Sequence, residues 1–131
     1  MSEFWPRQRV LLTGGHGMLG VFIADRLRRE NPAALLTPRA AELDLRDAAA
    51  VRAFLRRHEP SLVIHAAGVV GGIGANRLHP GRFFYENAIM GIQLIEEARL
   101  AGAEKFVQLG TICAYPKFAP IPFHEDDLWN G

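Results

Sequence analysis

The stretch RVLLTGGHGMLG, residues 9–20, decides the fold. Its first five residues form a short apolar run next to a glycine, a pattern typical of a buried strand. Gly14, Gly17 and Gly20 follow at GxxGxxG spacing, and apolar residues at helical intervals predict a helix over about 17–30. The stretch therefore predicts a strand, a tight turn and a helix in immediate succession.

A glycine-rich turn between a strand and a helix is typical of a dinucleotide-binding site. The first glycine makes the turn, and the second lets backbone N–H groups approach a pyrophosphate at the positive end of the helix. The third lets the helix pack closely against the strand. The alternative is a glycine-rich turn that binds no ligand. The strand before it and the helix after it favour dinucleotide binding.

The rest of the chain continues the alternation of strands and helices. Further strands are predicted at 34–37, 61–66 and 105–109, helices at 47–58 and about 80–101, a glycine-rich loop at 68–74 and an irregular tail from 113. Such alternation predicts a parallel sheet with helices on both faces. We expect an α/β, Rossmann-like, doubly wound sheet of order 3-2-1-4. The fourth strand then lies at an edge, which suggests that later strands and a substrate domain are missing after Gly131.

Composition limits the class of protein. The 131 residues, 49% of them apolar and 22% charged with a net charge of +1, predict a single domain, 1–131, a partial NAD(P)-binding unit. This balance indicates no nucleic-acid or membrane partner. A single cysteine and widely spaced histidines exclude a disulfide framework and predict no metal site. The N-terminus resembles no signal peptide, so a cytoplasmic, soluble protein is expected.

The ends of the first two strands carry the candidate contacts to a nucleotide. Arg39, at the end of the second strand, is a candidate for the 2′-phosphate of NADP, or is simply a solvated surface arginine. Asp44 is placed to accept a hydrogen bond from the adenine amino group, although Asp44 or Asp47 can equally cap the next helix.

The ends of the third and fourth strands carry the remaining candidates. Small residues after His65 let a cofactor lie against the backbone, and His65 itself is interpreted as a packed histidine. Thr111 offers a hydroxyl for a substrate carbonyl. Cys113 is either an acid/base or a small buried hydrophobe, and Tyr115 is as well explained by a structural as by a catalytic role.

Together these positions form one predicted site. The predicted cofactor-binding residues are Gly14, Gly15, His16, Gly17, Met18, Leu19, Gly20, Arg39, Asp44, Leu45, Ala66, Ala67, Gly68, Leu109 and Gly110. The predicted catalytic residues are Thr111 and Cys113.

Several motifs together resemble one family of the extended short-chain dehydrogenases/reductases. The glycine turn and the HAAG segment at 65–68 resemble that group as a whole. The segments VGGIGAN at 70–76, 80–87 and LGTICAYPK at 109–117 resemble the GDP-L-fucose synthase family, in register from about residue 9 to 131. The chain thus resembles the N-terminal portion of an enzyme that epimerises C3 and C5 of GDP-4-keto-6-deoxy-D-mannose and reduces C4 with NADPH.

The resemblance implies roles for particular residues. Thr111 takes the place of the catalytic hydroxyl, normally a serine, and Cys113 that of the epimerisation cysteine. Family membership also implies a homodimer built on the long helix. The reaction fits the chemistry, because a C4 carbonyl acidifies the protons at C3 and C5, and hydroxyls stabilise the alkoxide formed by hydride transfer.

The chain departs from the family pattern at three places. Thr111-Ile112 replaces Ser-Ser, and His16 stands where an arginine often lies near the 2′-phosphate, which keeps NAD(H) open beside NADP(H). The chain contains no Tyr followed four positions later by Lys, so by itself it is expected to be inactive. Three alternatives stay open: a non-catalytic dinucleotide-binding module, a truncated product, and an epimerase or dehydratase for another nucleotide sugar.

Overall fold

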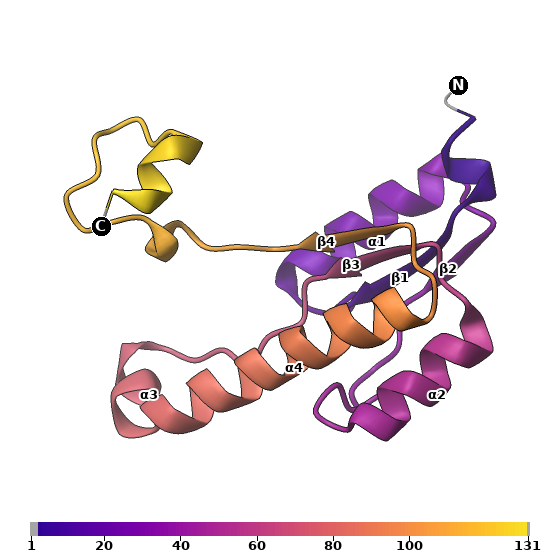
Figure 1. The fold of residues 1–131 in the computed structure, drawn as a ribbon, viewed down its shortest axis with the longest axis horizontal. Helices are drawn as coiled ribbons and strands as arrows, with labels where there is room; N and C mark the ends of the chain where they lie inside the picture. The colour runs from indigo at the N-terminus through magenta and orange to yellow at the C-terminus, as the bar shows by residue number, and fades with distance from the viewer. Residues whose placement is uncertain (1–2, 131) are drawn as a thin grey trace.

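A four-stranded parallel sheet forms the centre of the protein, whose computed structural model describes residues 3–130. The strands are β1 (Arg9–Thr13), β2 (Ala34–Leu36), β3 (Leu62–His65) and β4 (Lys105–Gln108). The α-helices are α1 (Met18–Glu30), α2 (Ala48–His58), α3 (Ile73–Leu78) and α4 (Pro80–Leu100). The expected α/β, Rossmann-like, doubly wound class is confirmed, because every strand pair is parallel and helices cover both faces (Figure 1).

The two faces of the sheet carry separate hydrophobic clusters. Val10 and Leu12 of β1 pack with Ala24 and Leu27 of α1 on one face. Leu11 points the other way, toward the cluster formed by α2 and α4. Because alternate residues of β1 are buried on opposite faces, the strand is apolar throughout, as expected of a strand covered by helices on both sides.

The strand order corrects the sequence-based prediction. The observed order is β2-β1-β3-β4, whereas 3-2-1-4 was expected. All four residues of β3 are buried, which suits a central strand, and β3 pairs with β1 through Val10 and Leu62. The three residues of β2 are only half-buried, which suits an edge. The expected edge position of β4 is confirmed, with Val107 40% exposed.

Local signals set the ends of most elements. Asp47 caps α2, since its Oδ1 accepts hydrogen bonds from the backbone N–H groups of Ala49 and Ala50. Asn31 ends α1 in the left-handed conformation, and Gly102, with φ of 82°, follows α4. Helix α3 was missed, because the glycines around it predicted only a loop over 68–74.

The chain after β4 leaves the sheet in an extended segment and ends in short turns. Figure 1 shows this tail standing apart from the layers of sheet and helices. It contains two 3-10 helices, Ile112–Ala114 and Glu125–Trp129. Among residues 3–130, no helix is long and apolar enough to cross a membrane.

Candidate functional site

A cleft of about 380 Å³ lies at the carboxyl ends of β1, β2 and β3. The chain passes from β1 to β2 on one side and then crosses to β3 on the other, so this is the point where the strand order reverses. Open α/β sheets bind ligands at such a point. The lining residues are Thr13, Gly14, His16, Gly17, Pro38, Arg39, Ala40, Leu43, Asp44, Leu45, Arg46, Ala67, Gly68, Val69 and Met90.

The glycine turn fits tightly against the sheet. Gly14 has φ of +69°, and a Cβ on it would lie 2.6 Å from the backbone nitrogen of Ala67. A Cβ on Gly20 would overlap the carbonyl oxygen of Gly14. Gly17 is the N-cap of α1 and lines the cleft with no capping side chain, so the helix begins at the cleft. The spacing of the three glycines therefore has a steric reason at the first and third positions.

A buried hydrogen-bonded group forms the floor of the cleft. Thr13 Oγ1 accepts a hydrogen bond from the Ala67 N–H at 3.3 Å and lies 2.6 Å from His65 Nδ1. Burial lowers the pKa of His65, which favours the neutral ring. The Thr13–His65 hydrogen bond joins the ends of β1 and β3. His65 is a packed histidine, as the sequence indicated.

The end of β2 presents one free cation to the cleft. The backbone N–H of Arg39 donates to Glu42 Oε2 at 2.7 Å, which fixes the turn that carries it. Within residues 3–130 the Arg39 guanidinium has no hydrogen-bond or ion-pair partner. His16, also in the cleft lining, donates from Nε2 to the Thr37 carbonyl oxygen at 2.9 Å.

The segment before α2 places a carboxylate, Asp44, in the cleft lining, where it is paired with Arg46. Asp44 accepts three hydrogen bonds from Arg46, each 2.9 Å long. These bonds lower the pKa of Asp44 to about 2. Of the two caps considered from sequence, Asp47 is the helix cap and Asp44 is not.

Helix α4 holds the loop after β3 in place. Asn87 Oδ1 accepts from the Val69 N–H at 2.8 Å, and Asn87 Nδ2 donates to the Val69 carbonyl at 2.9 Å. These two hydrogen bonds from one side chain to the backbone of Val69 order the loop, although the loop is rich in glycine. Gly68 and Val69 thereby line the cleft.

The structure brings eight of the fifteen predicted cofactor residues into the cleft lining. The other seven lie outside the lining: Gly15 is buried in the turn and Gly20 on α1, Met18 and Leu19 are exposed on α1, Ala66 follows β3, and Leu109 and Gly110 follow β4. Their predicted role in cofactor binding stays a prediction.

The predicted catalytic residues lie outside the cleft lining. Thr111 and Cys113 are both exposed in the segment after β4, and Thr111 Oγ1 accepts from the Cys113 N–H at 3.2 Å. Cys113 is therefore not a buried hydrophobe in the described residues. Tyr115 stacks on Phe123 with ring centroids 4.6 Å apart, a structural contact.

Sequence reasoning missed part of the lining. Arg46 carried no motif, although its place two residues after Asp44 is a local signal for a charge pair. Met90 lies at a helical interval in α4, distant in sequence from every other lining residue. Only the packing of α4 over β3 brings it to the cleft, so no short-range pattern identifies it.

The fold and the cleft define the class: a doubly wound α/β domain with a dinucleotide-type glycine turn at its switch point. Comparison with known proteins then gives the family. The model of the NAD dependent epimerase/dehydratase family matches residues 10–130, and the chain belongs to this family.

Individual relatives narrow the likeness. The chain is 38% identical over 123 residues to a GDP-L-colitose synthase of Yersinia pseudotuberculosis, covering 94% of this chain and 40% of that protein. It is 39% identical over 124 residues to a GDP-L-fucose synthase of Sinorhizobium fredii, covering 95% and 39%. Thus the chain spans about two fifths of the length of these relatives.

A solved structure shares the fold closely. A GDP-mannoheptose C4 reductase from Campylobacter jejuni, solved with NADP bound, aligns with a TM-score of 0.89 at 26% identity. The alignment covers 98% of this chain and 40% of that one.

Proposed function

We propose that the cleft binds NADP(H), and that the chain is the N-terminal, cofactor-binding part of a GDP-sugar epimerase/reductase. The observation that carries this proposal is the uncapped start of α1 at Gly17, which opens into a cleft at the switch point of the sheet. Backbone N–H groups at such a helix start bind phosphate groups.

The residues at the turn fit a pyrophosphate. No side chain at Gly14 or Gly17 separates the backbone from a ligand, and Gly14 holds a conformation that favours glycine. The positive end of the α1 dipole adds to the attraction. When bound, the nicotinamide supplies hydride to a carbonyl carbon.

Arg39 supports NADP(H) over NAD(H). Its guanidinium, which has no partner among the described residues 3–130, stands after the end of β2, where a 2′-phosphate would lie. The two carboxylates nearby are engaged in local bonds, since Glu42 accepts from the Arg39 N–H and Asp44 pairs with Arg46, so neither neutralises the Arg39 guanidinium.

The proposed reaction follows the named relatives. Both synthases carry GDP-sugar names, and the solved neighbour is a C4 reductase. Among GDP-sugars, we assign GDP-4-keto-6-deoxy-D-mannose, which gives GDP-L-fucose. In the complete enzyme Thr111 stabilises the alkoxide formed at C4, and Cys113 exchanges protons at C3 and C5.

For the 131-residue chain by itself we propose cofactor binding without turnover, because its sequence contains no Tyr-x-x-x-Lys pair. A homodimer remains part of the proposal. Exposed apolar side chains on α4, Phe84, Ile92 and Ile95, support it.

A fluorescence titration of the purified protein with NADPH and with NADH tests the proposal. We expect Arg39→Ala to weaken NADPH binding by about tenfold or more and to change NADH binding by less than about twofold, because only NADPH carries the 2′-phosphate. Gly17→Glu should abolish binding of both, since a carboxylate at the helix start repels the pyrophosphate.

The matched control is Arg57→Ala, an exposed arginine on α2 outside the cleft lining, which should leave both affinities unchanged. Failure of the unaltered protein to bind NADPH, or NADPH affinity that survives Gly17→Glu, would contradict the proposal.

A further inference from the structure

Helix α4 is hydrogen-bonded to the cleft segment that contains Asp44, Leu45 and Arg46. Gln93 Nε2 donates to the backbone carbonyls of Leu45 at 3.2 Å and Arg46 at 3.1 Å. Met90, one helical turn before it, lines the cleft itself. The segment that carries Asp44 is therefore attached to a helix that is remote in sequence.

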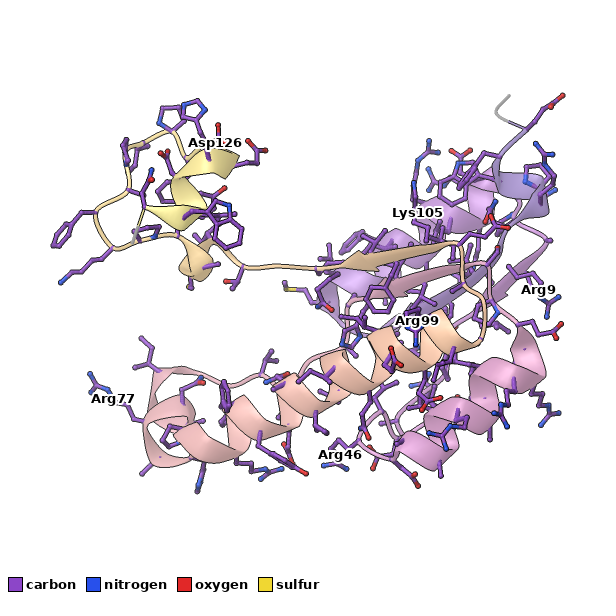
Figure 2. All side chains as sticks on the ribbon, viewed as in Figure 1. Arg9, Arg46, Arg77, Arg99, Lys105 and Asp126 are labelled. Atoms are coloured by element: carbon purple, nitrogen blue, oxygen red, sulfur yellow. The ribbon has the colours of Figure 1, made fainter. Side chains whose placement is uncertain are left out.

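The Arg46 side chain spans the gap between this segment and α4, as Figure 2 shows. Nε donates to Asp44 Oδ1 and Nη2 to Asp44 Oδ2, both at 2.9 Å, so the pair is bidentate. The remaining nitrogen, Nη1, donates to Glu86 Oε1 at 3.0 Å. All three guanidinium nitrogens are thus committed to carboxylates within the protein.

Glu86 provides a fixed anchor on α4. Its side chain is only 12% exposed, and its second oxygen, Oε2, accepts from Arg82 Nε at 3.2 Å. A carboxylate held by two guanidinium groups has little freedom to turn. The position of Glu86 therefore fixes the position of Arg46.

The hydrogen bonds leave Asp44 with a defined remaining capacity. A carboxylate has about four acceptor positions. Oδ1 uses two, for the backbone N–H and Nε of Arg46, and Oδ2 uses one, for Nη2. The pKa of Asp44, held at about 2 by these bonds, keeps the group ionised at neutral pH and unable to donate. Within residues 3–130, no protein donor occupies the other acceptor position on Oδ2.

We propose that Arg46, anchored on α4 by Glu86, is a positioning residue that orients Asp44 to accept a hydrogen bond from the amino group of the adenine base. This inference rests on the proposed function of the cleft. An ionised acceptor selects an amino donor and rejects a base with a carbonyl oxygen at the same place, because that oxygen would face an unpaired carboxylate oxygen. Arg46 thus acts through Asp44 rather than on the cofactor.

The test compares NADPH with its hypoxanthine analogue, in which a carbonyl replaces the adenine amino group. We expect the unaltered protein to prefer NADPH by about tenfold or more, the value of one hydrogen bond to a charged group. In Arg46→Leu the Asp44 carboxylate keeps only its bond from the backbone N–H of residue 46, so its two oxygens are no longer both fixed, and the preference should fall below about threefold. A role confined to stability would change both affinities together and leave their ratio intact.

Arg99→Leu is the matched control. Arg99 also forms a bidentate pair with a carboxylate, Glu96, but on the exposed surface of α4 farther along the helix (Figure 2). It should keep the full preference. Glu86→Gln removes the charge of the anchor without shortening the side chain, and this variant should also lose the preference for NADPH. It provides the test if Arg46→Leu does not fold.

The outcomes separate this inference from the function on which it rests. Absence of NADPH binding by the unaltered protein would overturn the proposed function. Binding of NADPH without preference over the analogue would overturn the contact of Asp44 with the adenine amino group, and a preference retained in both Arg46→Leu and Glu86→Gln would overturn the role of Arg46. Either result leaves the proposed function intact.

Discussion

The cleft and the segment after β4 are held in very different ways. Cleft residues come from the ends of three strands and from α4, and buried contacts such as Thr13 with His65 fix them. Thr111 and Cys113 are exposed and are held by local hydrogen bonds: Thr111 accepts from the Cys113 N–H at its Oγ1 and from the Ala114 N–H at its carbonyl oxygen. Among residues 3–130 the cleft, the proposed cofactor site, is therefore preformed by the core, whereas the segment with the predicted catalytic residues is ordered at Thr111 and Cys113 by contacts within itself.

This difference indicates where mutations will be felt. A change in the cleft acts on contacts between elements that are distant in sequence, so it affects folding and binding together. A change in the segment after β4 acts on solvent-exposed groups and should leave the described core intact. Matched substitutions in the two regions test this comparison.

The largest contrast is expected for alanine at two glycines. In Gly20→Ala the new Cβ meets the backbone of Gly14 and Gly15, which cannot move aside, so we expect a loss of about 3 kcal/mol in the free energy of unfolding. In Gly110→Ala the Cβ meets no atom within 4 Å, and the expected change is below about 0.5 kcal/mol. Urea denaturation monitored by circular dichroism measures both.

Equal losses for Gly20→Ala and Gly110→Ala would contradict the comparison, because they would require contacts around Gly110 as close as those at the turn. A small loss for Gly20→Ala alone would show that the turn relaxes more readily than its backbone contacts indicate.

The second contrast applies one substitution to two threonines. Thr13→Val removes a buried hydroxyl that bonds His65 Nδ1 and the Ala67 N–H, and about 2 kcal/mol of stability should be lost. Thr111→Val removes a hydroxyl that accepts one exposed bond at 3.2 Å, and the loss should stay below about 0.5 kcal/mol. Valine has the shape of threonine, so packing changes little in either case.

Thermal unfolding and NADPH titration of both variants check this contrast. Thr13→Val should weaken NADPH binding as well, since Thr13 lines the cleft, while Thr111→Val should leave it unchanged. A Thr111→Val variant that loses as much stability as Thr13→Val would disprove the local character of the segment after β4.

Much of the fold was predictable because its signals are local. The apolar run 9–13, the glycine spacing and Asp47 before α2 each act within a few residues, and each predicted its element. Strand order was not predictable in this way. Strand order depends on the packed sheet, in which the fully buried β3 has a neighbouring strand on each side.

The same division holds for the site. Gly14, Gly17 and Arg39 were found because a turn and a strand end place them at the cleft directly. Arg46 and Met90 were missed because both depend on α4, which lies some forty residues after Asp44 in the sequence. Met90 is a residue of α4, and Arg46 is bonded to Glu86 of that helix. The catalytic roles of Thr111 and Cys113 rest on their place after the fourth strand and on the resemblance, and they stay predictions.

The smallest expected effect concerns the ion pair that joins α2 to α4 behind the cleft. Arg52 Nη2 donates to Glu97 Oε1 at 2.6 Å, and Nε contacts both carboxylate oxygens. Arg52 is half exposed, so solvent screens the pair. We expect Arg52→Leu to lower the Tm by about 3 °C at pH 7 without changing NADPH affinity. This would show that apolar packing, rather than this ion pair, forms the cleft.

The pH dependence identifies the ion pair as the cause. The Arg52 guanidinium lowers the pKa of Glu97 from its ordinary value of 4.5, so the folded protein binds this proton less readily than the unfolded chain. The stabilisation is therefore complete above pH 4.5 and is lost as the pH falls further. The Tm difference between unaltered protein and Arg52→Leu should shrink from pH 7 toward pH 3, while Arg57→Leu, its exposed neighbour on α2, should show no such trend. A difference that stays constant over this range would assign the effect to lost packing of the Arg52 side chain.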